Sequence, residues 1–351
     1  RRIASIVFRI AGTDARDVAS GIDRQGRWSS RNIEDALYWR LTRWAERIGV
    51  DDPESLWIGP AARAAIARHR QTPFDAVIST GPPHFAHRVA LRVAQATGLP
   101  WLADVRDPLV SDFDRRQTSA RRNHRMRQLE QAIVDRAAAV VTTCPAFARN
   151  LQERYPQRAK KVRAITNGFD PDDIRQAIGP DELTGLTSET CVFVAAGSFY
   201  GRRELARIIE PLQQVLDRNP AWADRVRLVI AGTIDAEQRA ALEKNTPAWV
   251  SVTGYLDHVE AIRLTAAAAC NIIIVPDCEH GRLSIPGKTF ELLALPAHVL
   301  ALVPSSSDTA AILQAVGDAS VVALEDTASV ASATERIIAS HLAENQLSPA
   351  A

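Results

Sequence analysis

The chain has 351 residues, of which 46% are hydrophobic and 24% charged, the balance of a folded globular protein rather than a disordered or fibrous one. Its 42 Lys and Arg residues against 41 Asp and Glu residues give a net charge of +1, which excludes a global attraction to nucleic acid. A chain of this length predicts about two domains. The four cysteines show no paired spacing, so we expect neither a zinc site nor a disulfide framework, and a reducing compartment fits.

The sequence offers no obvious route into or across a membrane. No apolar run reaches the roughly 18 residues that span a bilayer, and residue 1 is not followed by a signal-peptide pattern. We therefore expect a cytoplasmic protein. Arginine is dense between residues 115 and 127, around His124. This cluster is either a solvated helix face or a contact for anionic lipid or a phosphate-bearing acceptor, and the second interpretation predicts peripheral attachment to the inner membrane face.

The first half of the chain becomes regular after Phe74. Before Phe74, we expect a strand at residues 2–10 and a helix at residues 36–48. From Phe74 onward, short apolar runs alternate with amphipathic stretches, as parallel strands and crossover helices do. Gly98, followed by Pro100, is expected to end a helix. The predicted elements are strands at residues 74–79, 101–105, 137–143 and 162–166, and a helix at residues 84–97.

A polar stretch at residues 179–188 is typical of a linker. The alternation then restarts, with strands expected at residues 191–196, 226–231, 250–253, 271–275 and 299–303. The pattern predicts an α/β fold of two doubly wound, Rossmann-like domains, residues 1–178 and residues 189–330. Residues 331–351 are expected to form a C-terminal helix that could cross back to the first domain. Ligands of such sheets bind beyond the carboxyl ends of the strands, in the cleft that two facing domains leave.

The most informative segment is residues 284–291, Ser-Ile-Pro-Gly-Lys-Thr-Phe-Glu. A strand leads into a polar loop, and Gly287, Lys288 and Thr289 open a helix, so backbone N–H groups and a cation converge where phosphates bind well. Glu291 lies one turn later and can accept hydrogen bonds from two neighbouring hydroxyls, as a ribose presents. The simpler alternative is a surface lysine and glutamate on an ordinary helix.

Two competing motifs fail on inspection. Gly281 and Gly287 enclose five residues, whereas a P-loop needs four, and Pro286 would remove one of its N–H donors. The D-x-D triplets at residues 112–114 and 170–172 could hold a divalent cation, but the second precedes a helix and serves as a cap. We interpret both as chance occurrences and assign no metal. No arrangement of Ser, His and Asp, or of Cys and His, indicates a hydrolase.

A loop after the second domain's first strand is a further candidate. Gly197 and Ser198 would let the backbone approach a ligand, and Arg202 or Arg203 could bind its phosphates. A plain strand-to-helix turn is the alternative.

Polar residues also end two strands of the first domain. His87 could donate to a sugar hydroxyl or a phosphate, and the side chains of Asp104, Arg106 and Asp107 could form a charge-paired wall of the cleft. Alternatively, His87 is a structural histidine and the other three only order their loop.

Taken together, these motifs resemble those of retaining GT-B glycosyltransferases of family four, particularly bacterial members that build surface polysaccharides or decorate small molecules. The resemblance covers about residues 57–325 and is carried by residues 75–83 with His87, 98–108, 165–170, 197–201 and 285–294. It implies a metal-independent hexosyltransferase without a cofactor. Such an enzyme moves a sugar from a nucleoside diphosphate sugar to a hydroxyl of a glycan, a lipid-linked sugar or a small molecule, with retention. Residues 1–178 would face the acceptor and residues 189–330 the donor.

The resemblance also implies roles for single residues. Glu291 falls on the second acid of the family's E-x7-E motif, which holds the donor ribose, whereas the first acid falls on Leu283. Gly287 and Lys288 match the diphosphate end, Arg202 and Arg203 loosely match the family's phosphate-binding basic residues, and His87 matches a histidine near the transferred sugar. We therefore expect His87, Lys288 and Arg202 to be catalytic.

Two departures from the family pattern keep other functions open. The family's initial strand and glycine-rich loop are not clear here, which predicts altered acceptor binding or a start that lacks upstream residues. The leucine at position 283 favours a rival, a non-catalytic protein that binds nucleotide sugars. A nucleotide-sugar isomerase on the same scaffold is a second rival.

Overall fold

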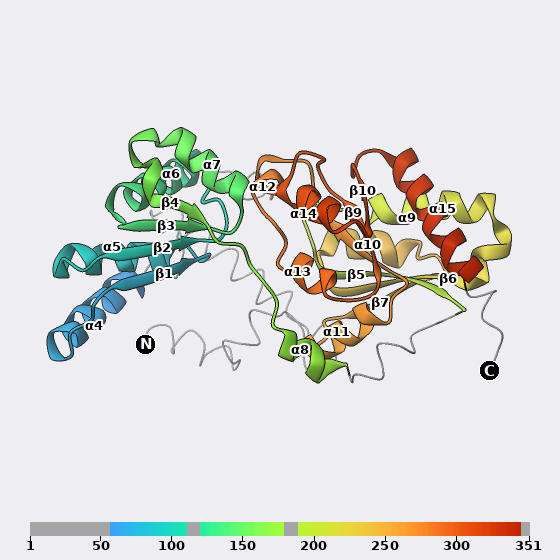
Figure 1. Cartoon of the computed structure of the whole chain (residues 1–351), viewed down its shortest axis with the longest axis horizontal. Coiled ribbons are helices and arrows are strands. Elements are labelled where there is room, and N and C mark those ends of the chain that lie inside the picture. The colour runs from blue at the N-terminus through green and yellow to red at the C-terminus, as the bar shows by residue number, and fades with distance from the viewer. Residues whose placement is uncertain (1–56, 111–119, 179–188, 345–351) are drawn as a thin grey trace. The chain divides into compact units, whose positions relative to one another are not determined.

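The computed structural model describes residues 57–110, 120–178 and 189–344. The strand expected at residues 2–10, the helix expected at 36–48, the linker at 179–188 and the triplet at 112–114 lie outside the described residues. Residues 1–64 and 65–351 form two compact units, and both β-sheets belong to the second unit. The predicted α/β class with parallel sheets is confirmed (Figure 1).

The first sheet has four parallel strands in the order β1-β2-β3-β4, so each strand pairs with the next one along the chain. Helix α5 packs against β1 and β2, and helix α7 packs against β3 and β4. We call this sheet and its helices the N-terminal lobe. Helix α4 (Ile58–Gln71) precedes the lobe in the chain. The elements of the lobe are β1 (Val77–Gly81), α5 (Phe85–Thr97), β2 (Trp101–Val105), α6 (Ala120–Arg136), β3 (Ala139–Thr142), α7 (Pro145–Arg154), η3 (Pro156–Lys161) and β4 (Val162–Ala164).

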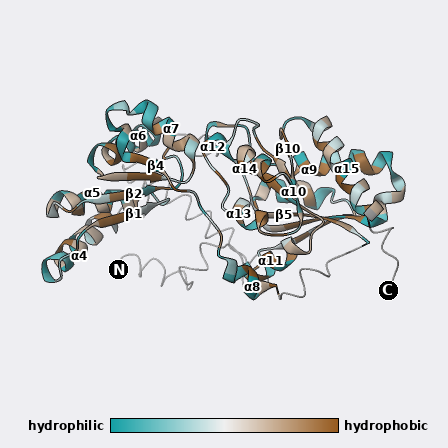
Figure 2. Cartoon of the chain, viewed as in Figure 1, coloured by the Kyte–Doolittle hydropathy of each residue, from teal (hydrophilic) through white to brown (hydrophobic). Residues whose placement is uncertain are grey.

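Local sequence signals explain several of these boundaries. Helix α5 ends at Gly98, which adopts φ 74° and donates its N–H to the carbonyl of Ala94, a left-handed cap that glycine tolerates best. Strand β2 has the predicted bounds, and its alternating burial shows that one face of the sheet is covered more completely than the other. Helix α6 is much more polar than the strands, as Figure 2 shows by its teal surface.

The second sheet has six parallel strands in the order β10-β9-β8-β5-β6-β7. We call it, with its helices, the C-terminal lobe. The chain first proceeds from β5 outward to β7, then returns to the other side of β5 and continues through β8 to β10. This reversal creates a switch point between β5 and β8, where doubly wound sheets bind ligands. The strands are β5 (Cys191–Phe199), β6 (Val226–Ile234), β7 (Val250–Gly254), β8 (Cys270–Ile274), β9 (His298–Leu302) and β10 (Ala319–Val322).

The helices of the C-terminal lobe cover this sheet and connect its strands. In α9, Ile208, Leu212, Val215 and Leu216 are buried, the spacing of one helix face packed on a core. The helical elements are α9 (Ala206–Arg218), η4 (Pro220–Arg225), α10 (Ala236–Lys244), α11 (His258–Ala266), α12 (Glu279–Arg282), α13 (Lys288–Leu293), α14 (Asp308–Val316) and α15 (Thr327–Glu344).

Two helices bear on the expected division of the chain. Helix α8 (Pro171–Ala177) packs against α11, and the side-chain Nε of Arg263 donates to the carbonyl of Ala177 at 2.7 Å. Residues 171–177, which the sequence pattern includes in the first domain, therefore pack on the C-terminal lobe. Helix α15 packs against α9 and the strands β5, β9 and β10 of the same lobe.

Candidate functional site

The carboxyl end of β5 meets the amino end of α13 at the switch point of the six-stranded sheet. There the Nζ of Lys288 donates a hydrogen bond to the carbonyl of Ala196. The next residue, Gly197, adopts φ 136°, and a β-carbon built on it would lie 3.4 Å from the same Nζ. The positive φ, which other residues rarely adopt, favours glycine here, whereas a β-carbon would only reach van der Waals contact with the lysine.

The electrostatic surroundings of Lys288 are unusual for a lysine. Burial, followed by the charge of Arg203, lowers its pKa to about 7. A partly buried amine whose charged neighbour is another cation lacks the compensation that a buried charge needs. An anion such as a diphosphate would supply that compensation, so this corner is suited to binding one.

A cavity of about 190 Å³ opens beside Lys288. Glu291, one turn along α13, faces it, and its Oε1 lies 3.0 Å from Nε2 of His258 at the start of α11. The other walls are mainly apolar, which suits a ring-shaped group with few polar atoms. We call it the apolar cavity; it is lined by Ile174, Ala196, Gly197, His258, Ala261, Ile262, Thr265, Lys288, Glu291, Leu292 and Leu295.

A second cavity, of about 230 Å³, lies on the other side of Gly287 and has mostly polar walls. Burial lowers the pKa of Arg203, while the charges of Tyr200 and Asp107 oppose that shift. Arginine and aspartate facing the same space can bind hydroxyl and phosphate oxygens together. We call it the polar cavity; it is lined by Arg106, Asp107, Thr143, Asn167, Arg203, His280, Ser284, Ile285, Pro286 and Gly287.

The predicted donor residues divide between these two spaces. Gly197, Lys288 and Glu291 line the apolar cavity, whereas Arg203 and Gly287 line the polar one. The donor residues Ser198 and Thr289, and the predicted catalytic residue Arg202, line neither cavity. The Oγ of Ser198 accepts a hydrogen bond from Thr233 on β6 at 2.9 Å, Thr289 is fully buried, and Arg202 has a buried Nε.

The start of α13 differs from the sequence expectation. The N–H of Thr289 donates to the carbonyl of Pro286 at 2.9 Å, and that of Phe290 to the carbonyl of Gly287 at 3.2 Å. These two N–H groups are therefore engaged within the turn rather than open to a phosphate, and α13 has only six residues. An anion at this corner would therefore be held by the cationic side chains of Lys288 and Arg203 rather than by these N–H groups.

His87 is completely buried beneath the end of β1. Its Nδ1 lies 2.8 Å from the Oγ of Ser79, which also accepts a hydrogen bond from Nε1 of Trp101 at 2.8 Å. Its Nε2 points at Gly81, where a β-carbon would be only 2.6 Å away. Burial lowers the pKa of His87 to about 4, so the ring is neutral at pH 7. This geometry favours the structural interpretation of His87, and a catalytic role stays a prediction.

Two of the three residues of the predicted cleft wall, Asp104 and Arg106, bond to neighbouring strand ends and loops. Asp104 accepts a hydrogen bond from Thr80 at 2.7 Å. Arg106 donates to the carbonyl of Pro82 at 3.0 Å, and its own carbonyl accepts from Thr143 at 2.7 Å. Arg106 and Asp107 nevertheless line the polar cavity, so ordering the loop and contacting a ligand are compatible for these two.

Sequence patterns missed three residues at these cavities. His258 precedes no recognisable motif, and its place beside Glu291 follows from the position of α11. Asn167, which follows β4, and His280, in the short helix α12, line the polar cavity. Asn167 belongs to the segment 165–170 that carries the family resemblance, but no pattern along the chain indicates that it faces Gly287.

Two other expectations concern metal and membrane. Within residues 57–110, 120–178 and 189–344, no group of three or more His, Cys, Asp or Glu side chains is arranged to hold a metal ion. The oxygen of Asp170 accepts the N–H of Asp172 at the start of α8, which confirms its capping role. None of the described helices is long and apolar enough to span a bilayer.

Comparisons with known proteins agree on the architecture. Residues 10–168 match the family model of the Glycosyl transferase 4-like domain. No curated protein matches the sequence significantly. An α,α-trehalose 6-phosphate synthase from Burkholderia multivorans superposes with a TM-score of 0.60 at 14% identity, over 83% of this chain and 70% of that one.

Two further solved structures resemble the chain. HepE of Anabaena, in complex with UDP and glucose, gives a TM-score of 0.52 at 14% identity, over 82% of this chain and 79% of its own. An Escherichia coli trehalose-6-phosphate structure bound with UDP-2-fluoro glucose gives a TM-score of 0.59 at 11% identity, over 82% of this chain and 72% of that one. The chain therefore has the GT-B fold of these glycosyltransferases, and its residues 10–168 are similar to the Glycosyl transferase 4-like domain.

Proposed function

We propose that the chain is a glycosyltransferase that moves a sugar from a nucleoside diphosphate sugar to an acceptor hydroxyl. One observation carries the proposal: Lys288 and Glu291 line the same cavity at the switch point of a GT-B sheet. The similarity of residues 10–168 to a glycosyltransferase domain supports it, as do neighbours that were solved with UDP and glucose or a UDP-sugar.

The two cavities suit different parts of such a donor. A base and ribose fit the apolar cavity, with the ribose hydroxyls on the carboxylate of Glu291. The diphosphate would lie against Lys288 and Arg203, and the sugar would extend into the polar cavity toward Arg106 and Asp107. This arrangement spreads the donor over both sides of residues 286–288.

The chemistry follows from charge. As the bond between the anomeric carbon and the diphosphate oxygen breaks, negative charge accumulates on the leaving group. Lys288 and Arg203 are fixed in a partly dry site and oppose that charge without reorganising, which lowers the barrier. His87 is neutral at pH 7 because burial lowers its pKa to about 4, so any part it plays is as a hydrogen-bonding group rather than a general acid.

Three finer features belong to the same proposal. Transfer proceeds with retention at the anomeric carbon, as in the family that the motifs resemble. The two cations replace a metal ion at the diphosphate, so transfer should persist in EDTA. The acceptor is a hydroxyl of a glycan, a lipid-linked sugar or a small molecule, and the protein works in the cytoplasm, at the inner membrane face if its acceptor is lipid-linked.

A donor panel tests the proposal. UDP-, GDP-, ADP- and dTDP-sugars are screened by thermal shift, because a ligand that binds only the folded state raises Tm. The stabilising donor is then incubated with candidate acceptors, and the released nucleoside diphosphate is measured. Lys288→Met should weaken binding strongly and abolish release, whereas Lys244→Met, at an exposed lysine on α10, should change neither.

The same assay separates the rival functions. Equal binding and transfer by the Lys288→Met variant and the wild type would refute the proposed site. Tight nucleotide binding without transfer to any acceptor would instead indicate a non-catalytic binder, and conversion of the donor without an acceptor would indicate an isomerase.

A further inference from the structure

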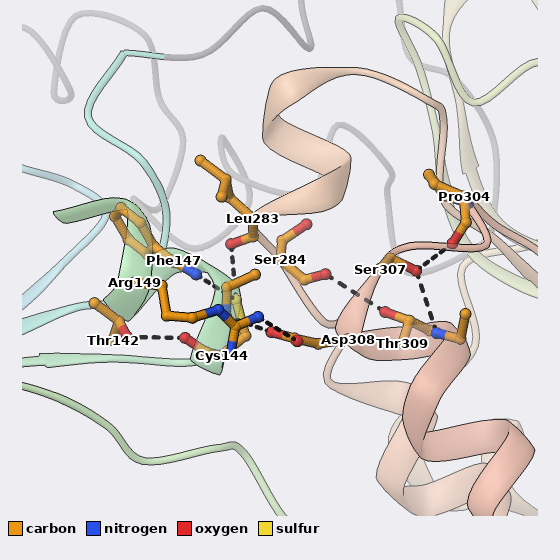
Figure 3. Close-up of polar contacts among 12 residues, drawn as sticks. Thr142, Cys144, Phe147, Arg149, Leu283, Ser284, Pro304, Ser307, Asp308 and Thr309 are labelled. Carbon is orange, nitrogen blue, oxygen red and sulfur yellow. Dashed lines mark hydrogen bonds and ion pairs between the residues drawn. The ribbon is translucent and has the colours of Figure 1, made fainter. Parts of the chain in front are cut away.

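The two lobes of residues 65–351 are joined next to the polar cavity by Asp308 (Figure 3). Asp308 is the first residue of α14 in the C-terminal lobe, and its side chain is only 15% exposed. Its Oδ2 accepts the N–H of Ala146 at 2.6 Å, and its Oδ1 lies 3.4 Å from Nη2 of Arg149. Both partners belong to α7 of the N-terminal lobe.

The partner of Asp308 is a helix N-terminus, where the backbone N–H donors have no acceptor within the helix. Helix α7 has Pro145 at its first position, which has no N–H, and the N–H of Phe147 already donates to the sulfur of Cys144. The N–H of Ala146 therefore needs an acceptor, and a carboxylate at a helix N-terminus is stabilised by the helix dipole as well. The acceptor comes from the other lobe.

Cys144 forms a second connection between the lobes. It is fully buried, and its Sγ donates to the carbonyl of Leu283 at 3.1 Å. Burial raises the pKa of this thiol to about 12, so it keeps its proton and remains a donor at neutral pH. Leu283 lies in the segment between α12 and α13, directly before the residues that line the polar cavity.

The third connection is apolar. Leu283 and Ile285 are 8% and 4% exposed, and they belong to the core cluster of the N-terminal lobe together with Phe147 and Leu151. The segment 283–285 is therefore inserted into the core of the opposite lobe. Gly287 and Lys288 follow within three residues, so the position of the donor cation depends on this insertion.

We propose that Asp308 is a positioning residue for the donor site, acting through α7 and the inserted segment 283–285. With Asp308 in place, Leu283 and Ile285 are held in the N-terminal lobe, and the 286–288 turn is fixed where it can meet a diphosphate. The donor site is thus completed by docking of the lobes. This inference rests on the proposed function for its ligand, but the docking itself is a property of the chain alone.

The chain contains its own reporter for this docking. Cys144 is buried at the junction, whereas Cys191 and Cys270 are buried in the core of the C-terminal lobe. Asp308→Ala should open the junction locally and raise the alkylation rate of Cys144 by about tenfold or more, as local opening does, while Cys191 and Cys270 react as in the wild type. Rates are read at each cysteine by mass spectrometry after treatment with N-ethylmaleimide.

Two controls make the result specific. Glu243→Ala, at an exposed carboxylate on α10, should leave all three rates unchanged. The carboxylate of Asp308 also raises the pKa of Cys144, so loss of its charge alone speeds alkylation. Asp308→Asn loses this charge but keeps an acceptor oxygen, so its Cys144 rate should fall between those of the wild type and Asp308→Ala. Equal rates in the two variants would mean that the lost charge, and not an opened junction, causes the rise, and would overturn the proposal. A rise at all three cysteines would mean global destabilisation, and an unchanged Cys144 rate would mean that Asp308 does not hold the junction; either result overturns the proposal.

A link between nucleotide binding and the junction at Cys144 would show that Asp308 positions the donor site and does not only stabilise the fold. UDP, GDP, ADP and dTDP are each tested for protection of Cys144 in the wild type, although the thiol lies outside both cavities. The nucleotide that binds should slow alkylation of Cys144, and Asp308→Ala should weaken its affinity, because coupling between two sites is reciprocal. Binding without protection overturns the positioning role. If none of the four nucleotides binds the wild type, the proposed function fails, and the alkylation rates without ligand still test the docking.

Discussion

Binding of a nucleoside diphosphate should be coupled to proton uptake at Lys288. Burial and the nearby charge of Arg203 lower the pKa of this amine to about 7 in the free chain. A diphosphate in contact with the amine favours its charged form and returns its pKa toward the usual value of about 10.4. About half of the free amines are neutral at pH 7, so about half a proton should be taken up per ligand there, and about 0.9 at pH 8.

The affinity should consequently fall as the pH rises above 7. Between pH 7 and pH 9 the protonated fraction of the free amine drops about 50-fold, and Kd should rise by nearly that factor, about 2.3 kcal/mol, while the complex stays protonated. The second ionisation of the terminal phosphate, near pH 6, is almost complete at pH 7 and adds little to this change.

Isothermal titration calorimetry measures both quantities. Titrations of the nucleotide that stabilises the chain, run in two buffers of different ionisation enthalpy, give the number of protons taken up at each pH. Lys288→Met should bind the nucleotide weakly, and its Kd should not depend on pH in this range. Glu291→Gln should also bind more weakly, but its Kd should keep the pH dependence of the wild type. A wild type that takes up no protons and has the same Kd at pH 7 and pH 9 would refute the assignment of the anion to Lys288.

Three further predictions address the ribose contact, the sheet and the buried histidine. Glu291→Ala should weaken a nucleoside diphosphate by roughly tenfold or more, and inorganic pyrophosphate hardly at all, in competition binding, since only the former presents ribose hydroxyls. Gly232→Ala should lower the free energy of unfolding in urea by about 3 kcal/mol or more, because the residue has φ 128° and its new β-carbon would lie 1.9 Å from a carbonyl oxygen of β5. Ser79→Ala should cost about 2 to 4 kcal/mol in the same assay, since it leaves ring nitrogens of His87 and Trp101 buried without their shared partner.

Much of the fold could be predicted from periodicity alone. Strand β8 is buried at every position and has the continuous apolar run typical of a central parallel strand. Strand β10 was missed because Ala319–Val322 is short, only partly buried and at the sheet edge, where packing leaves a weak apolar signal. Loops and caps that follow local rules, such as Gly98 after α5 and Asp170 before α8, were predictable for the same reason.

The site was less accessible to sequence patterns because it is assembled from distant segments. The motif around Lys288 and Glu291 could be found, since its residues lie on one turn of helix. The choice of Arg203 rather than Arg202 as the residue facing a cavity depends on the direction in which the turn after β5 points its side chains, and two adjacent arginines carry no signal of that. The first N–H groups of α13 were expected to be available to a ligand, yet two of them donate to carbonyls within the tight turn.

The insertion of Leu283 into the N-terminal lobe limits how this protein could be altered by selection or by engineering. A glutamate at this position would restore the acid that the E-x7-E pattern expects, but its carboxylate would enter a core in which the present side chain is only 8% exposed. An unpaired charge in such surroundings costs several kcal/mol or titrates to its neutral form. Leu283→Glu alone would therefore add a possible sugar contact but weaken the packing between the lobes. A stable variant would need compensating changes on α7 as well.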